Sequence, residues 1–138
     1  LTTFAHELAL AVVFESGLIH FPDSFSSYLS IPAEPRRFLR EVPACWDETL
    51  CLKGYPGKYV VVARRKGKKW FVAGINGQGK KQSLALQLPF LAQDPSKLIL
   101  IEDVPRGRGF LCKEIKISKR NLLNLTLLPY GGFVAWTP

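Results

Sequence analysis

The sequence has no methionine, and its 138 residues include only two histidines and three cysteines. Because translation starts at methionine, we expect these residues to be a fragment or a processed product of a longer chain. His6 and His20 are far apart and lack a ligand-like neighbour, so they indicate no metal site. No apolar run approaches the roughly 18 residues that span a bilayer, so we expect no membrane span.

The three cysteines form no recognisable motif. Cys45 and Cys51 lack the CxxC spacing of redox and zinc sites, and no histidine lies near them. With Cys112 the number is odd, so at least one thiol is unpaired within the chain. We expect buried free thiols, and a Cys45–Cys51 disulfide is the alternative in an oxidising compartment.

Acidic residues are outnumbered: 11 Asp and Glu face 19 Lys and Arg, for a net charge of +8. Such an excess is typical of nucleic-acid-binding domains. Most of it, however, lies at 64–69, 80–81, 106–108 and 118–120, each beside a predicted turn where lysines are simply solvated. No nucleic-acid-binding motif accompanies these runs, so we expect no nucleic-acid partner.

Carboxylate pairs suited to acid–base catalysis are equally rare. Asp47 and Glu48 are adjacent, as are Glu102 and Asp103, and adjacent residues on a strand point to opposite faces. They cannot readily flank one substrate bond, so salt bridges or turns are the better interpretation. No GxSxG motif or supported Ser-His-Asp set is present. We therefore expect no catalytic residue in this chain.

The first 42 residues are predicted to be mainly helical. Leu1, Phe4, Leu8 and Val12 recur at helical spacing up to about residue 15 and fall on one face, while Leu10 and Phe14 lie opposite. A helix with two apolar sides is expected to pack on both of them. Residues 18–42 are expected to hold loops and a second short helix, with Pro35 in its first turn.

From residue 43 onward the pattern predicts strands. The later ones alternate apolar and polar residues, as half-buried antiparallel strands do. Short strands at this spacing predict a mainly β fold, an antiparallel two-layer β-sandwich of about eight strands after a helical N-terminal segment. The expected strands are 46–52, 58–65, 69–76, 82–88, 97–104, 110–117, 121–127 and 132–136.

The hairpin of residues 58–76 does not follow that alternation, because both faces of both strands are apolar. Val60 and Val62 point to the opposite face from their neighbours on the first strand, and Trp70 and Val72 do the same on the second. One face can meet the second sheet of the sandwich. The other requires a helix or a neighbouring domain to cover it.

Aromatic residues allow a second interpretation. Trp46, Trp70 and Trp136, with several tyrosines, could form a sugar-stacking platform on a β-sandwich, as in a carbohydrate-binding module. Aromatic residues within apolar strands more often pack in cores and interfaces. Carbohydrate binding therefore stays the alternative, and its candidate residues are Trp46, Asp47 and Glu48, which are also salt-bridge candidates.

Four strings carry a family resemblance, in order across nearly the whole chain. They are AHELALAVVFESGLIHF (5–21), FLREVPACWDET (38–49), GYPGKYVVVARRKGKKWFVAGING (54–77) and GGFVAWTP (131–138). Together they resemble the C-terminal region of glycoside hydrolase family 97, bacterial enzymes of the α-glucosidase and α-galactosidase type. The resemblance implies that 1–42 is the end of a (β/α)8 catalytic barrel and 43–138 a C-terminal β-sandwich domain.

The resemblance further implies that the catalytic carboxylates and calcium-binding glutamates of the parent lie upstream, so this chain holds no cofactor. It implies a periplasmic or cell-envelope location in a Gram-negative bacterium. The expected partners are the barrel of the parent chain and, through self-association, a second copy. The expected role is a non-catalytic accessory domain that braces the barrel and contributes to oligomerisation. The residues expected to pack against the barrel are Phe4, Leu8, Leu10, Val12, Phe14, Val60, Val62, Trp70 and Val72.

Overall fold

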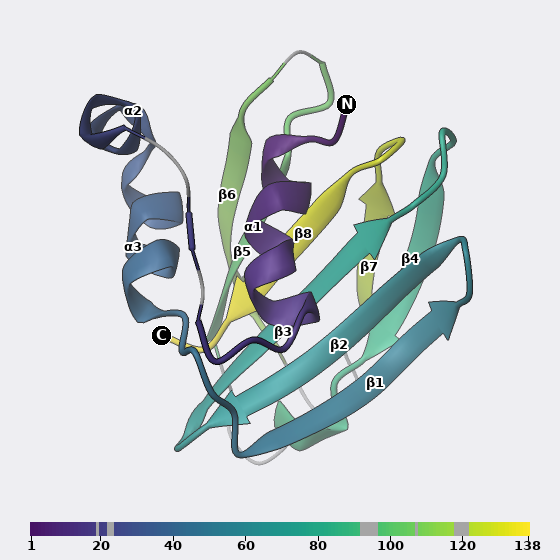
Figure 1. Cartoon of the computed structure of the whole chain (residues 1–138). Coiled ribbons are helices and arrows are strands. Elements are labelled where there is room, and N and C mark those ends of the chain that lie inside the picture. Colours follow the sequence, from purple (N-terminus) through teal and green to yellow (C-terminus); the bar gives the residue numbers. More distant parts are fainter. Residues whose placement is uncertain (19, 22–23, 92–96, 107, 118–121) are drawn as a thin grey trace.

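A computed structural model describes residues 1–18, 20–21, 24–91, 97–106, 108–117 and 122–138, in which three α-helices precede eight strands (Figure 1). The predicted basic turn at 118–120, residue 107 and the expected first residue of one strand, Asn121, lie outside the described residues. The elements are α1 (Phe4–Val13), α2 (Phe25–Ser30), α3 (Ala33–Glu41), β1 (Glu48–Tyr55), β2 (Tyr59–Lys66), β3 (Lys69–Asn76), β4 (Gln82–Gln87), η1 (Pro89–Leu91), β5 (Lys97–Asp103), β6 (Phe110–Lys116), β7 (Leu122–Leu127) and β8 (Gly132–Trp136).

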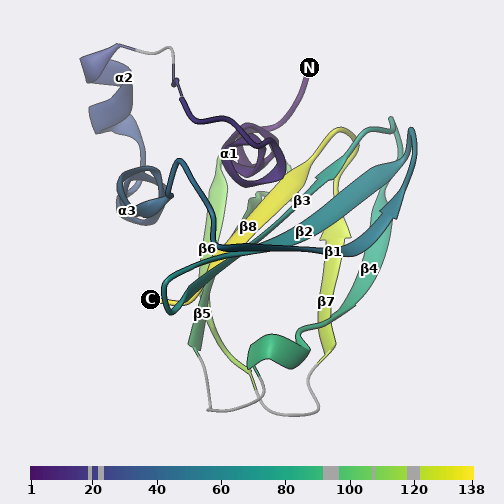
Figure 2. The same cartoon turned by 60° about the horizontal axis from the view of Figure 1, so that its bottom comes forward.

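The strands form two sheets that face each other. One has six strands in the order β1-β2-β3-β8-β5-β6, and the other pairs β4 with β7. All neighbouring strands are antiparallel. Figure 2 shows β4 and β7 as a separate layer beside the larger sheet. This confirms the predicted mainly β, two-layer sandwich with a helical segment before it.

An inner core fills the space between the sheets. In β4 from Ser83 onward and throughout β7, buried side chains that belong to this core alternate with exposed ones. The larger sheet contributes residues of the hairpin and of β5 and β8. The main members are Val61, Ala63, Trp70, Val72, Leu84, Leu86, Leu98, Leu100, Leu123, Leu125, Leu127, Phe133 and Ala135.

A second core lies on the outer face of the six-stranded sheet. Helix α1 crosses that face and contacts β3, β8, β2 and β5, and α3 adds Phe38 beside it (Figure 1). This outer core contains Leu8, Ala9, Ala11, Val12, Phe38, Val62, Phe71, Ala73, Ile99, Ile101, Val134 and Trp136. The cover that the hairpin requires is thus supplied within this chain.

The hairpin register corrects the expectation for two residues. Val62 pairs with Ala73 and faces the outer core, whereas Val72 pairs with Ala63 and faces the inner core. Paired residues point to the same face of a sheet, so Trp70 joins Val72 inside the sandwich. Residues of this chain enclose both side chains. The expectation that Trp70 and Val72 pack against a neighbouring domain is therefore wrong.

Small residues allow α1 to lie close against the sheet. Ala5 and Ala9, which belong to α1, are fully buried. At the crossing with β8, a Cβ atom on Gly132 would lie 2.7 Å from the Cα of His6, closer than real Cβ atoms approach. Glycine is therefore required at this position because the two backbones touch.

The N-terminus of α1 is anchored by Asp103 at the end of β5. Its Oδ2 accepts hydrogen bonds from Thr3 Oγ1 at 2.6 Å and from Gly132 N at 3.1 Å, while Oδ1 accepts one from Ala5 N at 3.0 Å. Thr3 is also the N-cap, whose side chain accepts a hydrogen bond from His6 N. A negative charge at a helix N-terminus also interacts favourably with the helix dipole. The anchor fixes the start of α1 to the sheet.

We expect Asp103→Ala to destabilise the chain by about 2–4 kcal/mol, because hydrogen bonds to a charged group contribute about 1.5–3 kcal/mol each and are not additive. Urea unfolding measures the loss, and hydrogen exchange locates it in the amides of α1. Asp103→Asn is the matched control, since it keeps one carbonyl oxygen and should lose less. Equal stability of the Ala variant and the unchanged chain would contradict the anchor.

Candidate interdomain surface

The side of α1 that faces away from the sheet is apolar and largely uncovered. Phe4 is 39% exposed and Phe14 is 61% exposed, and Leu10 is half-buried between them. The spacing predicted one shared face for Leu1, Phe4, Leu8 and Val12, but in the structure they have different surroundings. Leu8 and Val12 lie in the outer core, whereas Leu1 and Phe4 are exposed. The helix therefore has two apolar sides, as expected, but only one of them is packed.

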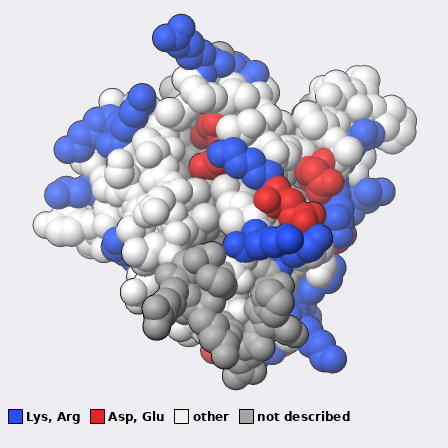
Figure 3. Space-filling model, turned by 180° about the vertical axis from the view of Figure 1, so that it is seen from behind, with Lys and Arg blue, Asp and Glu red and all other residues white. Residues whose placement is uncertain are grey.

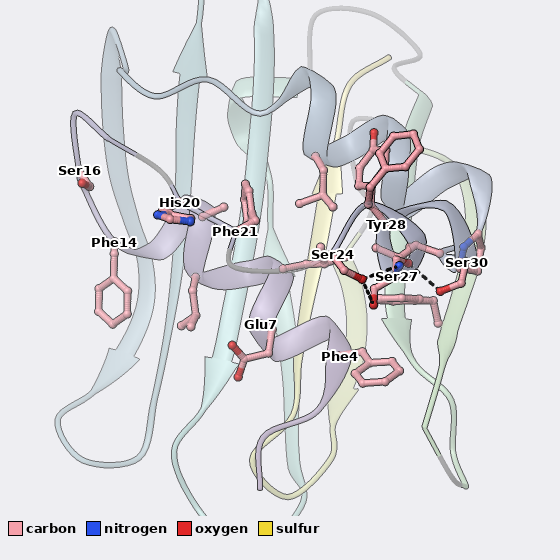
Figure 4. Close-up of a pocket in the computed structure, with 18 of the residues that line it drawn as sticks. Phe4, Glu7, Phe14, Ser16, His20, Phe21, Ser24, Ser27, Tyr28 and Ser30 are labelled. Carbon is pink, nitrogen blue, oxygen red and sulfur yellow. Dashed lines mark hydrogen bonds between the residues drawn. The ribbon is translucent and has the colours of Figure 1, made fainter.

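A groove of about 1110 Å³ runs between this side of α1 and the segment that leads through α2 into α3. Figure 4 shows Phe4 and Phe14 at opposite ends of α1 and Phe21 and Tyr28 on the facing segment. Phe25, at the start of α2, is 77% exposed. The main apolar lining residues are Phe4, Leu10, Phe14, Leu18, Phe21, Phe25, Tyr28, Leu39 and Phe110.

Serines provide the polar part of the groove. Ser24 Oγ caps α2 by accepting a hydrogen bond from Ser27 N at 3.1 Å, and Ser30 Oγ donates to Ser27 O at 2.6 Å (Figure 4). Among the described lining residues, Glu7 is the only Asp, Glu, Lys or Arg. Most of the groove lining is therefore apolar.

Asp47 and Glu48, candidates for sugar binding or salt bridges, form salt bridges. Glu48 Oε2 lies 3.0 Å from Arg65 Nε, its partner in the β1–β2 register. Asp47 Oδ1 lies 3.3 Å from Lys66 Nζ, and its Oδ2 accepts a hydrogen bond from Gly67 N at 2.7 Å. Adjacent side chains point to opposite faces only within a strand, and Asp47 lies just before β1 begins. Both carboxylates can therefore reach basic residues at the same end of β2.

The Gly67 N–H and then the Lys66 ammonium lower the pKa of Asp47 below its usual value. In the unfolded chain the pKa of an Asp is about 3.9, and in the folded chain that of Asp47 is lower. The ionised carboxylate therefore stabilises the folded chain above about pH 3.9, and this stabilisation is lost as the pH falls towards the folded pKa. We expect Asp47→Asn to lower the Tm at neutral pH, with the difference shrinking below about pH 4. Thermal melts from pH 7 to pH 2 test this, and a constant difference over that range would contradict it.

The three tryptophans are packed rather than arrayed for sugar stacking. Trp136 is fully buried, and the Trp70 ring stacks on Phe90 at a centroid distance of 4.1 Å. Trp46 is half-buried against Phe71, with ring centroids 5.4 Å apart. Trp46 therefore belongs to the outer core, where it also lies 5.8 Å from the guanidinium of Arg64.

On one face of the molecule, basic side chains lie among acidic ones. Figure 3 shows Lys and Arg scattered over the face seen from behind, with Asp and Glu among them. Across the described strands several are paired, such as Lys113 with Glu102 at 2.8 Å and Lys97 with Glu114 at 2.8 Å.

The three cysteines are exposed free thiols in the structure, so the expected burial is wrong and the alternative Cys45–Cys51 disulfide is absent. Cys45 Sγ instead accepts a hydrogen bond from Lys66 Nζ at 3.3 Å. His6 is buried, and its Nδ1 donates to Gly131 O at 3.3 Å. Among the residues that the structure describes, no group of three or more His, Cys, Asp or Glu side chains could hold a metal ion.

Comparison with known proteins assigns the family. A sequence model of the family 97 glycosyl hydrolase C-terminal domain, described as an oligomerisation domain, matches residues 45–137. This chain belongs to glycoside hydrolase family 97. The expected family is thereby confirmed, and so is the assignment of the chain to its accessory C-terminal oligomerisation domain.

Two relatives are each much longer than this chain. The retaining alpha-galactosidase of Bacteroides thetaiotaomicron is 36% identical over 135 residues, which cover 95% of this chain and 20% of that protein. The probable retaining alpha-galactosidase of Streptomyces bingchenggensis is 33% identical over 140 residues, covering 97% and 21%. The chain therefore spans about a fifth of the length of these relatives.

Solved structures of longer chains contain the same fold, helices included. A β-arabinopyranosidase superimposes with a TM-score of 0.89 at 31% identity, over 99% of this chain and 21% of that one. A family 97 enzyme from Pseudoalteromonas sp. strain K8, in complex with acarbose, gives 0.88 at 22% identity over 99% and 22%. The helical segment and the sandwich thus recur together within longer chains.

Sequence reasoning missed two residues of this family 97 domain that hold α1. Asp103 was expected in a turn or salt bridge, and nothing local links it to a helix 98 positions earlier. Arg64 was counted among the solvated basic residues, yet it is 5% exposed and its Nη2 donates to Val13 O at 3.2 Å. The signal for Arg64 was its position in an otherwise apolar strand.

Among the described residues, no helix has the length and apolarity needed to cross a membrane.

Proposed function

We propose that this chain is the non-catalytic C-terminal domain of a larger family 97 glycoside hydrolase, where it braces the catalytic barrel and contributes to subunit contacts. The observation that carries this proposal is the uncovered apolar side of α1, in a chain that spans a fifth of its relatives. Soluble monomers seldom leave contiguous apolar surface exposed, so this side indicates a missing partner.

The carboxylates of the sandwich support a structural role. Glycoside hydrolysis requires two carboxyl groups that flank the scissile bond and are free to exchange protons or attack carbon. Here Asp47 and Glu48 are paired with basic residues, Glu102 is paired with Lys113, and Asp103 anchors α1. We therefore propose that catalysis belongs to the upstream part of the parent and that this chain alone has no hydrolase activity.

The family resemblance implies calcium in the parent. The described residues do not fit such a site, because they offer no convergent group of acidic or histidine ligands. We place the calcium site in the upstream barrel, together with the catalytic residues. The family resemblance also supports our proposal of a periplasmic or cell-envelope location in a Gram-negative bacterium, which fractionation of the source cells would test.

The direct test compares the complete gene product with residues 1–138 on aryl α-galactosides, followed by aryl α-glucosides and aryl β-arabinopyranosides. We expect hydrolysis only by the complete product, since the relatives named above are glycosidases. Activity of the 138-residue chain, or absence of activity on all three substrates from a folded complete product, would overturn the proposal. The first substrate is chosen because two relatives are named retaining alpha-galactosidases.

A further inference from the structure

The outermost strands are the places where a β-sandwich can accept another strand. Among the described residues, β1 and β6 end the larger sheet, and β4 and β7 pair only with each other, so each has one open edge (Figure 2). The N–H and C=O groups along an open edge can hydrogen-bond to a further strand. Natural proteins usually prevent this with charged side chains, proline or a bulge.

Both edges of the larger sheet carry such protection. β1 has a bulge between Cys51 and Lys53, and Lys53 adds a charge at the same place. β6 carries Lys113, Glu114 and Lys116 among its seven residues. A further strand would meet a charged or interrupted edge in either case, which disfavours pairing there.

β4 is protected by its neighbour in the other sheet. The strand has no charged residue of its own, but it contacts β1, and Lys53 Nζ donates a hydrogen bond to Ala85 O at 3.2 Å. A carbonyl group of β4 thus already has an ammonium partner. A strand that paired with Ala85 O would have to displace Lys53.

β7 has none of these features. It contains no charged residue and no proline, and its register with β4 runs from Leu122 to Leu127 without a shift. Every second residue of an antiparallel strand directs its N–H and C=O away from the partner strand. Among the described residues, β7 is hydrogen-bonded to no strand except β4, so these groups lie along the open edge. Of the open edges, that of β7 is therefore best suited to accept another strand.

The occupant that fits this edge is β7 of a second copy. The family model described as an oligomerisation domain covers residues 45–137, which include β7. Two copies that each carry a net charge of +8 repel each other, so a contact between them is most favourable where charge is absent. The β7 edge meets that condition in both copies.

The sequence of β7 is also compatible with pairing to itself. In β7 Leu123 and Leu125 are buried on the inner face, while Asn124 and Thr126 are exposed on the outer face. If two copies run antiparallel about Asn124 or Leu125, Leu123 lies opposite a leucine and Asn124 lies opposite Asn124 or Thr126. Because side chains alternate with a period of two, either arrangement keeps the leucines on the inner face.

We propose that β7 pairs edge to edge with β7 of a second copy, in antiparallel orientation about a two-fold axis. Two-fold dimers are the commonest soluble homo-oligomers. The pairing joins the two-stranded sheets of both copies into one continuous sheet with the order β4-β7-β7-β4. The proposal rests on the proposed function, in its part on subunit contacts, and adds the strand and the backbone hydrogen bonds that make them.

The test introduces Asn124→Lys and Thr126→Lys together into the complete gene product. About either centre the pairing then brings lysines opposite each other, and like charges directly opposite destabilise a strand pair. The matched control is Ala85→Lys with Ser83→Lys, which places the same charges on the register partners of these residues in β4, on the same exposed face. Sedimentation measures association. Hydrogen exchange of the unchanged product, followed against concentration, compares the amides of β7 with those of β1 and β6.

We expect the β7 variant to associate about tenfold more weakly or worse and the β4 control to stay within about twofold of the unchanged product. In the unchanged product the β7 amides should gain protection as the oligomer forms, while those of β1 and β6 do not.

A complete product that stays monomeric, or a β7 variant that associates as the control does, overturns the proposal. So do β7 amides that are equally protected in monomer and oligomer, because another segment of the parent then occupies the edge. An oligomer that ignores the β7 variant leaves the proposed function standing, since its subunit contacts then lie elsewhere. The substrate assay tests the proposed function independently of all these results.

Discussion

A chain that begins at residue 43 is expected to lose cooperative folding and to aggregate, although it retains all eight strands and the whole family 97 match. Removing α1 and α3 would expose the outer core of the six-stranded sheet, where Phe71, Ile101, Val134 and Trp136 are now at most 1% exposed. Each such side chain contributes about 1.5–3 kcal/mol by burial. Several of them together approach the total stability of a domain, about 5–15 kcal/mol.

The measurements are the soluble yield, the thermal transition by circular dichroism and the binding of a hydrophobic dye, compared between residues 43–138 and 1–138. Co-expression of residues 1–42 as a separate chain is the control, because it returns α1 and α3 and should recover solubility. If residues 43–138 melt cooperatively and bind no dye, the helices are not part of the folding unit. That outcome would also remove the support for α1 as a helix shared with the upstream domain.

The strands could be predicted because their pattern is local. Leu84, Leu86, Leu123 and Leu125 recur at every second position, and most of the residues beside them, such as Asn124, are polar. Such alternation is typical of a half-buried strand. The apolar residues on both faces of the hairpin also predicted that both faces are covered. Its register could not be read with the same certainty, since all of its faces are apolar, and for this reason Trp70 and Val72 were grouped with Val60 and Val62.

The packing of α1 depends on contacts that are distant in sequence. Spacing predicted two apolar sides but could not decide which one meets the sheet. The small residues Ala5 and Ala9 decide it, because they allow the backbone to approach Gly132 on β8. The anchor from Asp103 spans nearly the whole chain, so no local pattern reveals it.

The groove was predicted only in part. The second apolar side of α1 followed from the positions of Leu10 and Phe14, although it was expected to be packed, and the opposing wall was not predicted. Helix α2 has only six residues, too few for a helical period to be recognised, and its start depends on Ser24 as N-cap. The candidate site thus required the structure, because it lies between one helix that the sequence predicts and another that it does not.

Phe38→Ala is expected to cost about 3–5 kcal/mol, the range for removing a fully buried phenylalanine. Phe38 is the residue by which α3 enters the outer core, with its ring centroid 5.4 Å from that of Trp136 and 6.3 Å from that of Phe71. Urea unfolding of residues 1–138 measures the loss. Phe25→Ala is the control: it removes the same ring from a position that is 77% exposed, and should change stability by no more than about 0.5 kcal/mol. Equal losses in the two variants would mean that α3 does not pack as described, whereas the expected difference would show that the helices and the sandwich fold as one unit.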